Sequence, residues 1–189
     1  AYCREFADCL KDLVIQEVVP GDDDLQFSVA AYCNRRSTPL ATFVARKIRQ
    51  NPPGFGTGTF VLSWYEPTIE QTAVSFLEKI NYRGIAELEF KRDERAGVVK
   101  MIEVNTRFWV QNNLATHCGV DLPYIAYSDI VGEEVGRHGQ SQKSVKWINV
   151  FDDFQACFST AGYYKKGKIS LWNWLSSLAG EKEYATLAI

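Results

Sequence analysis

The sequence predicts an α+β fold: an antiparallel sheet flanked by helices, with a small aromatic-rich C-terminal extension. Three observations indicate this class. Residues 25–33 alternate apolar and polar side chains with the period of a half-buried strand. Residues 67–80 begin with a proline and carry apolar residues at helical spacing. Residues 84–92 and 98–105 are strand-like segments that flank a short glycine-containing turn, which is typical of a hairpin.

The other elements follow from turn chemistry and apolar spacing along the 189 residues. The expected helices cover residues 2–11, 67–80, 111–118 and 122–131. The expected strands cover residues 13–19, 25–33, 40–48, 84–92 and 98–105, and a Pro/Gly loop covers 51–59. We expect one unit over residues 1–132, a polar linker over 133–145 and an extension over 146–189. Aromatic side chains in that extension predict a second small core.

Composition excludes several classes of protein. Hydrophobic residues make up 46% and charged residues 23%, which is an ordinary globular composition. The formal net charge of −2 argues against binding of nucleic acid by bulk electrostatics. No apolar run approaches the roughly 18 residues that span a bilayer, so no membrane partner is expected. The oligomeric state cannot be read from the sequence.

The cysteines indicate a reducing compartment. Five cysteines are scattered without a CxxC motif, and the two histidines have no zinc-ligand spacing. His117 and Cys118 are adjacent, and neighbours on a helix do not face each other, so a Cys/His nucleophile is not expected. The prediction is therefore five free thiols in a cytoplasmic protein.

Residues 84–109 carry the most informative chemistry. If Glu94 pairs with Val98 across the loop 95–97, then Glu89 faces Glu103 and Glu87 faces Asn105. These four polar side chains would share one face of the hairpin. The apolar side chains would share the other face, namely Ala86, Leu88, Phe90, Ile102 and Val104.

Two interpretations of the polar face stay open. Carboxylates directly opposite each other destabilise an antiparallel pair. Carboxylates with an amide oxygen suit a hard divalent cation such as Mg²⁺, which keeps its other positions for water and phosphates. The alternative is a solvated, Glu-rich face with ordinary ion pairs, for which Lys91 and Arg107 are the available cations.

The segment Ile-Glu-Val-Asn-Thr-Arg at 102–107, with Glu89 fourteen residues before Glu103, resembles the magnesium-binding end of the ATP-grasp fold. This fold is shared by carboxylate–amine ligases, biotin carboxylase and the large subunit of carbamoyl-phosphate synthetase. The resemblance implies that the chain is the C-terminal lobe of an ATP-grasp enzyme. It also implies the metal ligands for Mg²⁺ or Mn²⁺: Glu89, Glu103 and Asn105.

Residues 14–21 resemble the hinge strand of that family, beside which the nucleotide binds. The resemblance implies that Glu17 and the backbone of Val18 and Val19 meet the adenine of ATP. An acidic residue shortly after the hinge glycine is expected to take the ribose hydroxyls. Asp24 is the expected residue, with Asp22 or Asp23 as alternatives.

Arg46, Lys47 and the loop 54–58 resemble the phosphate- and substrate-facing segment of the family, and 119–124 is also typical of its carbamoyl-phosphate synthetase branch. The resemblance implies that Arg46, Lys47 and Arg107 counter charge on the transferred phosphoryl group. The implied reaction is an ATP-dependent carboxylate–amine ligation through an acyl phosphate. Its partners would be a small-molecule carboxylate and an amine.

The resemblance covers about residues 10–132. The family's earlier lobe, whose lysines clamp the phosphates, has no counterpart in the 189 residues. We therefore expect a C-terminal lobe that depends on an N-terminal lobe of the same polypeptide and is inactive alone. The alternative is a non-catalytic nucleotide-binding or interaction module derived from ATP-grasp.

Overall fold

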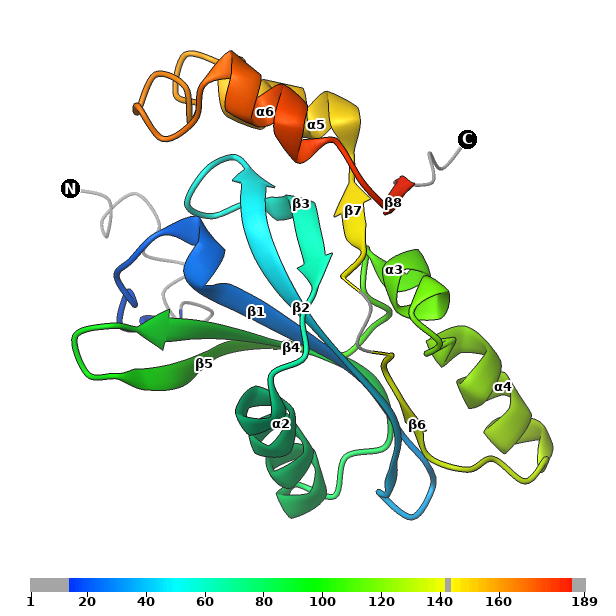
Figure 1. Cartoon of the computed structure of the whole chain (residues 1–189). Helices are drawn as coiled ribbons and strands as arrows, with labels where there is room; N and C mark the ends of the chain where they lie inside the picture. Colours follow the sequence, from blue (N-terminus) through cyan, green and yellow to red (C-terminus); the bar gives the residue numbers. More distant parts are fainter. Residues whose placement is uncertain (1–13, 142–143, 185–189) are drawn as a thin grey trace, which may run out of the picture.

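A computed structural model describes residues 14–141 and 144–184, and in it eight strands form one sheet (Figure 1). The order across the sheet is β5-β4-β1-β2-β3-β7-β8, and β6 pairs with β2 off this path. The strands are β1 Gln26–Cys33, β2 Pro39–Asn51, β3 Thr57–Ser63, β4 Gly84–Asp93, β5 Val98–Asn105, β6 His138–Gly139, β7 Lys146–Ile148 and β8 Lys182–Tyr184.

The sheet is mixed rather than purely antiparallel. The main pairs, from β5–β4 to β3–β7, are antiparallel as expected. The pairs β2–β6 and β7–β8 are parallel. Strand β1 lies between β2 and β4, so side chains from these three strands meet on each face.

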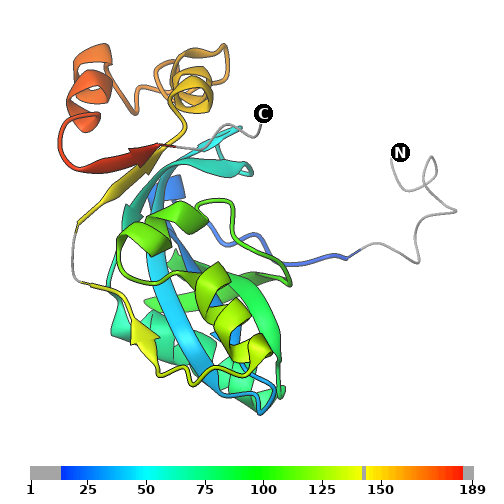
Figure 2. The ribbon, with the colours of Figure 1, turned by 90° about the vertical axis from the view of Figure 1, so that its right-hand side faces the viewer.

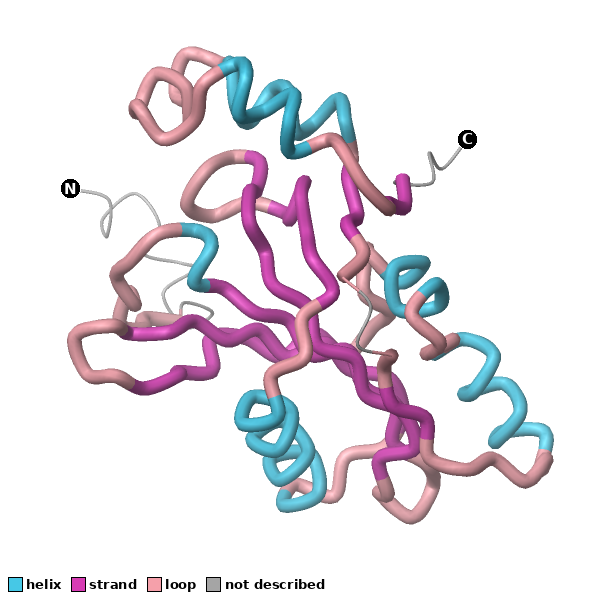
Figure 3. Tube along the Cα trace, viewed as in Figure 1, coloured by secondary structure: helices cyan, strands magenta, loops and turns pink. Residues whose placement is uncertain are grey.

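The described helices are α2 Pro67–Lys79, α3 Asn112–His117, α4 Leu122–Val131, α5 Val150–Phe158 and α6 Leu171–Ser177 (Figure 3). The expected helices after residue 66 are confirmed within a residue or so at their ends. The helix expected over residues 2–11 lies outside the described residues. None of the helices in the described part has the length and apolar character needed to cross a membrane.

The two faces of the sheet are covered differently (Figures 1 and 2). On one face, helix α2 contributes Ile69, Ala73 and Leu77 to a core with β1, β2 and β4. On the other face, α3 and α4 build a core over the part of β1 and β2 that carries Ala30 and Phe43. The rest of this second face, toward the other end of β1, carries polar side chains instead.

The expected strand over residues 13–19 is wrong for its described part. Residues 14–20 form neither strand nor helix. Val14 and Ile15 are 84% and 95% exposed. An extended segment becomes a strand only when a neighbour takes up its backbone hydrogen bonds, and no described segment does so here.

The hairpin pairs Glu89 with Glu103 as expected, but by a different route. The turn is one residue longer, because Asp93 rather than Glu94 faces Val98. A bulge between Glu89 and Phe90 then shifts the register back by one residue. The bulge also takes Ile102 out of the pairing, so its expected place on the apolar face is wrong. Ile102 lines a pocket on the polar face with Lys91 and Lys100.

The C-terminal extension contributes both to the sheet and to a core of its own. Strand β7 pairs with β3. Helices α5 and α6 enclose a small cluster in which Trp174 packs edge-on against Phe154 and Phe158. The second small aromatic core is therefore confirmed.

A buried ion pair attaches this extension to the sheet. Asp153 of α5 is fully buried and accepts two hydrogen bonds of 2.8 Å from Arg49 of β2. It also accepts from Thr59 of β3 at 2.9 Å and from the indole of Trp174 at 2.8 Å. The contacts with Arg49 and Thr59 tie α5 to β2 and β3, and the contact with Trp174 ties α6 to α5.

Candidate active site

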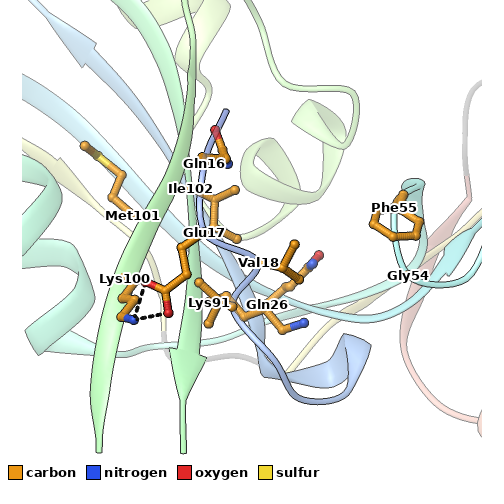
Figure 4. A pocket seen from close by; sticks show the side chains of 11 residues that line it. Gln16, Glu17, Val18, Gln26, Gly54, Phe55, Lys91, Lys100, Met101 and Ile102 are labelled. Carbon is orange, nitrogen blue, oxygen red and sulfur yellow. Dashed lines mark hydrogen bonds and ion pairs between the residues drawn. The ribbon is translucent and has the colours of Figure 1, made fainter. Parts of the chain in front are cut away.

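Two pockets lie side by side on the polar half of the second face. The first lies between residues 14–20 and the hairpin β4–β5, with a volume of about 480 Å³ (Figure 4). The second, of about 410 Å³, lies over the carboxylates of the same hairpin. Phe55 lines both pockets, so the loop that carries it forms a wall common to the two.

The first pocket combines an apolar lining with a polar rim. Val18, Val19 and Ile102 line it, as the aromatic ring of Phe55 does. Buried Lys91 donates a hydrogen bond of 2.8 Å to the carbonyl oxygen of Gly21. This bond holds the end of the segment that runs over the pocket.

Glu17 lies at the rim of this first pocket (Figure 4). Its carboxylate accepts hydrogen bonds of 3.1 Å from Lys100 and pairs with Arg95 at 3.4 Å. Of the four residues expected to meet adenine and ribose, Glu17, Val18 and Val19 therefore line one pocket.

Asp24 and Arg46 are bound to each other away from both pockets. The guanidinium of Arg46 donates to the backbone oxygen of Asp24 at 2.6 Å and to its carboxylate at 3.0 Å. It lies over the ring of Trp64 at 5.0 Å from the centroid. Neighbouring residues on a strand point to opposite faces, which separates Arg46 from Lys47. The structure does not bring Asp24 or Arg46 to the other candidates.

The second pocket gathers the remaining candidates. Glu89 faces Glu103 across the hairpin, and Glu87 faces Asn105. All four line this pocket with Lys47 and Arg107. The expected geometry of the hairpin's polar face is therefore confirmed.

Charge pairing within the second pocket is incomplete. The ammonium of Lys47 donates to a carboxylate oxygen of Glu89 at 2.9 Å. Arg107 reaches the amide oxygen of Asn105 at 3.5 Å rather than a glutamate. Among the described residues, no basic group forms an ion pair with Glu87 or Glu103. The ion pairs expected from Lys91 or Arg107 on a solvated face are thus not formed.

Glu87 shows the electrostatic effect of this crowding. Its side chain is 4% exposed. Burial and then the negative charge of Glu89 raise the pKa of Glu87 to about 7. Lys47 and Arg107 act in the opposite direction without cancelling these two causes. The pocket therefore favours an additional positive charge.

The donor set fits Mg²⁺ in a site that a nucleotide completes. Within residues 14–141 and 144–184, no three His, Cys, Asp or Glu side chains are arranged as a metal cage. The candidates are instead two carboxylates, Glu89 and Glu103, and the amide oxygen of Asn105. Mg²⁺ is usually bound by one or two carboxylates and completes its shell with waters and phosphate oxygens.

The wall between the pockets is a tightly folded loop over residues 51–57. A Cβ atom on Gly56 would lie 2.0 Å from the carbonyl carbon of Asn51, so only glycine fits there. The amide of Gly54 donates to a carboxylate oxygen of Asp23 at 3.1 Å. The same carboxylate oxygen accepts from the hydroxyl of Tyr163.

Sequence reasoning missed Gln26 and Tyr163 near these pockets, and it offered Asp23 only as an alternative contact for the ribose. Gln26 lines the first pocket, and its buried side-chain oxygen has no partner. Its place on the predicted strand 25–33, on the face of Ser28, is a signal that could have found it. Asp23 and Tyr163 are 140 residues apart, and no local pattern indicates their contact.

Comparisons with known proteins bear on the family and the fold. The family model "Carbamoyl-phosphate synthase L chain, ATP binding domain" matches residues 63–135. D-aspartate ligase from Enterococcus faecium is 28% identical over 146 residues, which are 74% of this chain and 35% of the ligase. The chain therefore spans about a third of the length of this curated relative.

A solved structure of biotin carboxylase from Campylobacter jejuni, a complex with β,γ-ATP, superposes with a TM-score of 0.52 at 15% identity. The superposition covers 64% of this chain and 27% of the carboxylase. At such low identity, the likeness concerns the fold. The matched part of the chain thus has the ATP-grasp fold, and residues 63–135 match the ATP-binding domain of the carbamoyl-phosphate synthase L chain.

Proposed function

We propose that the chain is the nucleotide- and magnesium-binding C-terminal lobe of an ATP-dependent carboxylate–amine ligase. One observation carries the proposal: a pocket with an apolar lining adjoins a pocket with an excess of carboxylates, and one loop forms the wall between them. A nucleotide has the same division, since its base is flat and weakly polar and its phosphates bind Mg²⁺. The relative from Enterococcus faecium, a D-aspartate ligase, supports this class of reaction.

The first pocket would hold adenine. Val18 and Ile102 line it and offer apolar surface for the faces of the base, and the backbone of Val18 and Val19 would offer hydrogen bonds to its edge. Glu17 would remain at the rim with Lys100. Asp24 would act on the ribose only after leaving Arg46, so we assign these two residues to support of the turn after Gly21.

The second pocket would hold the phosphates. Glu89, Glu103 and Asn105 would bind Mg²⁺, and the cation would neutralise charge on the β- and γ-phosphates. Lys47 and Arg107 would face the transferred phosphoryl group. Positioning and charge neutralisation are the main contributions that such a transfer needs from a protein.

The reaction would proceed in two steps. The substrate carboxylate attacks the γ-phosphorus of ATP, ADP leaves, and an acyl phosphate forms. The amine then attacks the acyl carbon, inorganic phosphate leaves, and the amine loses a proton as the amide forms. We propose that an N-terminal lobe of the same polypeptide supplies further phosphate contacts and the substrate site, and that the enzyme works in the cytoplasm.

Binding of Mn²⁺ with ATP tests the site. Mn²⁺ substitutes for Mg²⁺ and enhances the relaxation of water protons when it is bound to protein. We expect ATP-dependent enhancement with the wild-type chain and its loss in Glu103→Gln. The matched control is Glu94→Gln, which removes a carboxylate from the turn of the same hairpin. Equal loss in both variants, or no loss in either, would refute the metal assignment.

Trapping with hydroxylamine tests the chemistry, because an acyl phosphate reacts with it to give a coloured hydroxamate. The assay needs a polypeptide that includes an N-terminal lobe, Mg-ATP and a panel of carboxylic acids, with D-aspartate first. Hydroxamate that depends on ATP and on Glu103 supports the ligase. Tight Mg-ATP binding with no hydroxamate from any acid would favour the non-catalytic nucleotide-binding module.

A further inference from the structure

Three segments of the chain meet at the carboxylate of Asp23. Asp23 is 8% exposed and lies in the short helical turn η2 Asp23–Leu25, just before β1. One of its oxygens accepts hydrogen bonds from the backbone amide of Gly54 and from the hydroxyl of Tyr163. The hydroxyl of Tyr163 in turn accepts from the backbone amide of Gln50 at 3.0 Å. Tyr163 belongs to the C-terminal extension. Its hydroxyl therefore connects this extension to Asp23 and to Gln50, which precedes the loop 51–57.

The contact holds two boundaries of the nucleotide pockets. Gly54 precedes Phe55, whose ring lines both pockets. Asp23 lies two residues after Gly21, whose carbonyl oxygen accepts from Lys91, a lining residue of the first pocket. The position of the loop 51–57, which forms the wall between the pockets, therefore depends on the hydrogen bond from Gly54 to Asp23. A hydroxyl that fixes the carboxylate of Asp23 also fixes this wall.

Tyr163 is itself held firmly. Its side chain is 5% exposed in the small core that contains Trp174. That core is tied to β2 and β3 by the buried pair of Asp153 and Arg49. On the other side, Lys168 pairs with Asp22. The extension thus provides a rigid support from which the hydroxyl of Tyr163 points at the turn.

We propose that Tyr163 and Asp23 are positioning residues that hold the loop 51–57 in the place where it can close over the phosphates of a bound nucleotide. The inference rests on the proposed function. It assigns to the C-terminal extension a part in nucleotide binding, although none of its residues lines either pocket.

Hydrogen exchange of the metal-free chain tests the contact without any ligand. Tyr163→Phe keeps the ring in its core and removes only the hydroxyl. We expect the amides of residues 54–57, Gly54 above all, to exchange about threefold to tenfold faster, as expected for the loss of one hydrogen bond. Tyr164→Phe is the matched control, because Tyr164 is the next residue in the sequence and its side chain is 51% exposed. Unchanged exchange in Tyr163→Phe would overturn the proposal.

Titration with Mg-ATP then tests the use of the contact. The dissociation constant should rise about threefold to tenfold in Tyr163→Phe and in Asp23→Asn, since an ordered wall is lost. The Mn²⁺ enhancement at saturating ATP should stay at the wild-type value, because the metal ligands lie on the hairpin. Asp23→Asn leaves the aromatic core untouched, so the same change in both variants separates positioning from damage to that core.

The outcomes distinguish this inference from the proposed function. A wild-type chain that fails to bind Mg-ATP would end the proposed function and the inference with it. A wild-type chain that binds, with variants that bind equally well, would overturn the inference alone. A lower unfolding midpoint in Tyr163→Phe, with normal exchange at Gly54 and normal affinity, would show that Tyr163 merely attaches the extension.

Discussion

The carboxylate of Asp153 and the cluster of Glu87, Glu89 and Glu103 lie against the same sheet, and their surroundings are opposite. Asp153 is fully buried, and all its hydrogen-bonding capacity is used by Arg49, Thr59 and Trp174 at 2.8–2.9 Å. Glu87 and Glu89 lie beside Glu103, and Lys47 is the single ammonium that pairs with any of these three in the described part of the chain.

The difference separates a structural charge from a functional one. A buried charge that is fully paired stabilises the attachment of one element to another, and its removal leaves an uncompensated partner. A cluster of carboxylates with too few cations destabilises the folded chain until a cation binds. Such a cluster favours cation binding at the expense of folding stability. Four experiments test this distinction, in order of the expected change in stability.

Asp153→Asn should have the largest effect. It leaves the guanidinium of Arg49 buried without a counter-charge, and the loss of one partner of a buried pair costs about 3–5 kcal/mol. Urea unfolding measures the loss. Asp152→Asn, in the same helix turn, is the control and should cost less than about 1 kcal/mol. Equal losses of unfolding free energy in the two variants would contradict a structural role of Asp153.

Glu87→Gln should stabilise the metal-free chain, in a manner that depends on pH. The pKa of Glu87 is about 7 in the folded chain, above its ordinary value of 4.5. The folded state therefore holds this proton more tightly than the unfolded state, and stability falls as the pH rises between these values. At pH 8 the variant should be more stable by about 1–3 kcal/mol, and at pH 4 the two should match.

Urea unfolding of both proteins from pH 4 to pH 8 measures the effect of Glu87. A constant difference across this range would mean that packing, and not charge, causes it. A destabilised variant at pH 8 would show that Glu87 has a structural partner.

Glu103→Gln should have a smaller effect on the metal-free chain. It removes a repulsion across the hairpin, so stability should stay the same or rise by about 0.2–1 kcal/mol. The gain in melting temperature on addition of Mg-ATP should disappear. Thermal melts with and without Mg-ATP measure both quantities. A variant that melts lower without metal and still responds to Mg-ATP would place Glu103 among the structural charges.

Glu17→Gln should change stability least, by less than about 1 kcal/mol. Its carboxylate is 62% exposed and pairs with Lys100 and Arg95 at the surface, where water weakens such pairs. The change should shrink further between about 0.05 M and 0.5 M NaCl. A loss of stability that persists in high salt would indicate that Glu17 fixes the segment over the first pocket.

Local patterns predicted the elements that depend on local chemistry. The spacing of Ile69, Ala73 and Leu77 gave helix α2, and alternation gave β1. The opposition of Glu89 and Glu103 was predicted correctly although the turn was not, because the bulge at Glu89 compensates for the extra turn residue. A bulge leaves no clear mark in one sequence. The predicted turn was one residue too short and the bulge was not predicted, and these two errors cancel at Glu89 and Glu103.

The other failures concern contacts between distant segments. Residues 14–19 look like a strand, but no described neighbour pairs with them. Lys47 reaches Glu89 across β1, which requires the order β4-β1-β2, and this order cannot be read from local periodicity. The separation of Arg46 from Lys47 could have been predicted, because both lie on an expected strand and alternate residues face opposite sides.

The bulge at Glu89 has a consequence for how the protein behaves in concentrated solution. Strand β5 ends the order of the sheet as described, so its outer backbone groups can accept a strand from another molecule. Bulges and charged side chains discourage such edge-to-edge aggregation. The bulge, Lys100 and Glu103 all lie on this hairpin, so the irregularity that aligns the carboxylates also disfavours the pairing of another strand with this edge.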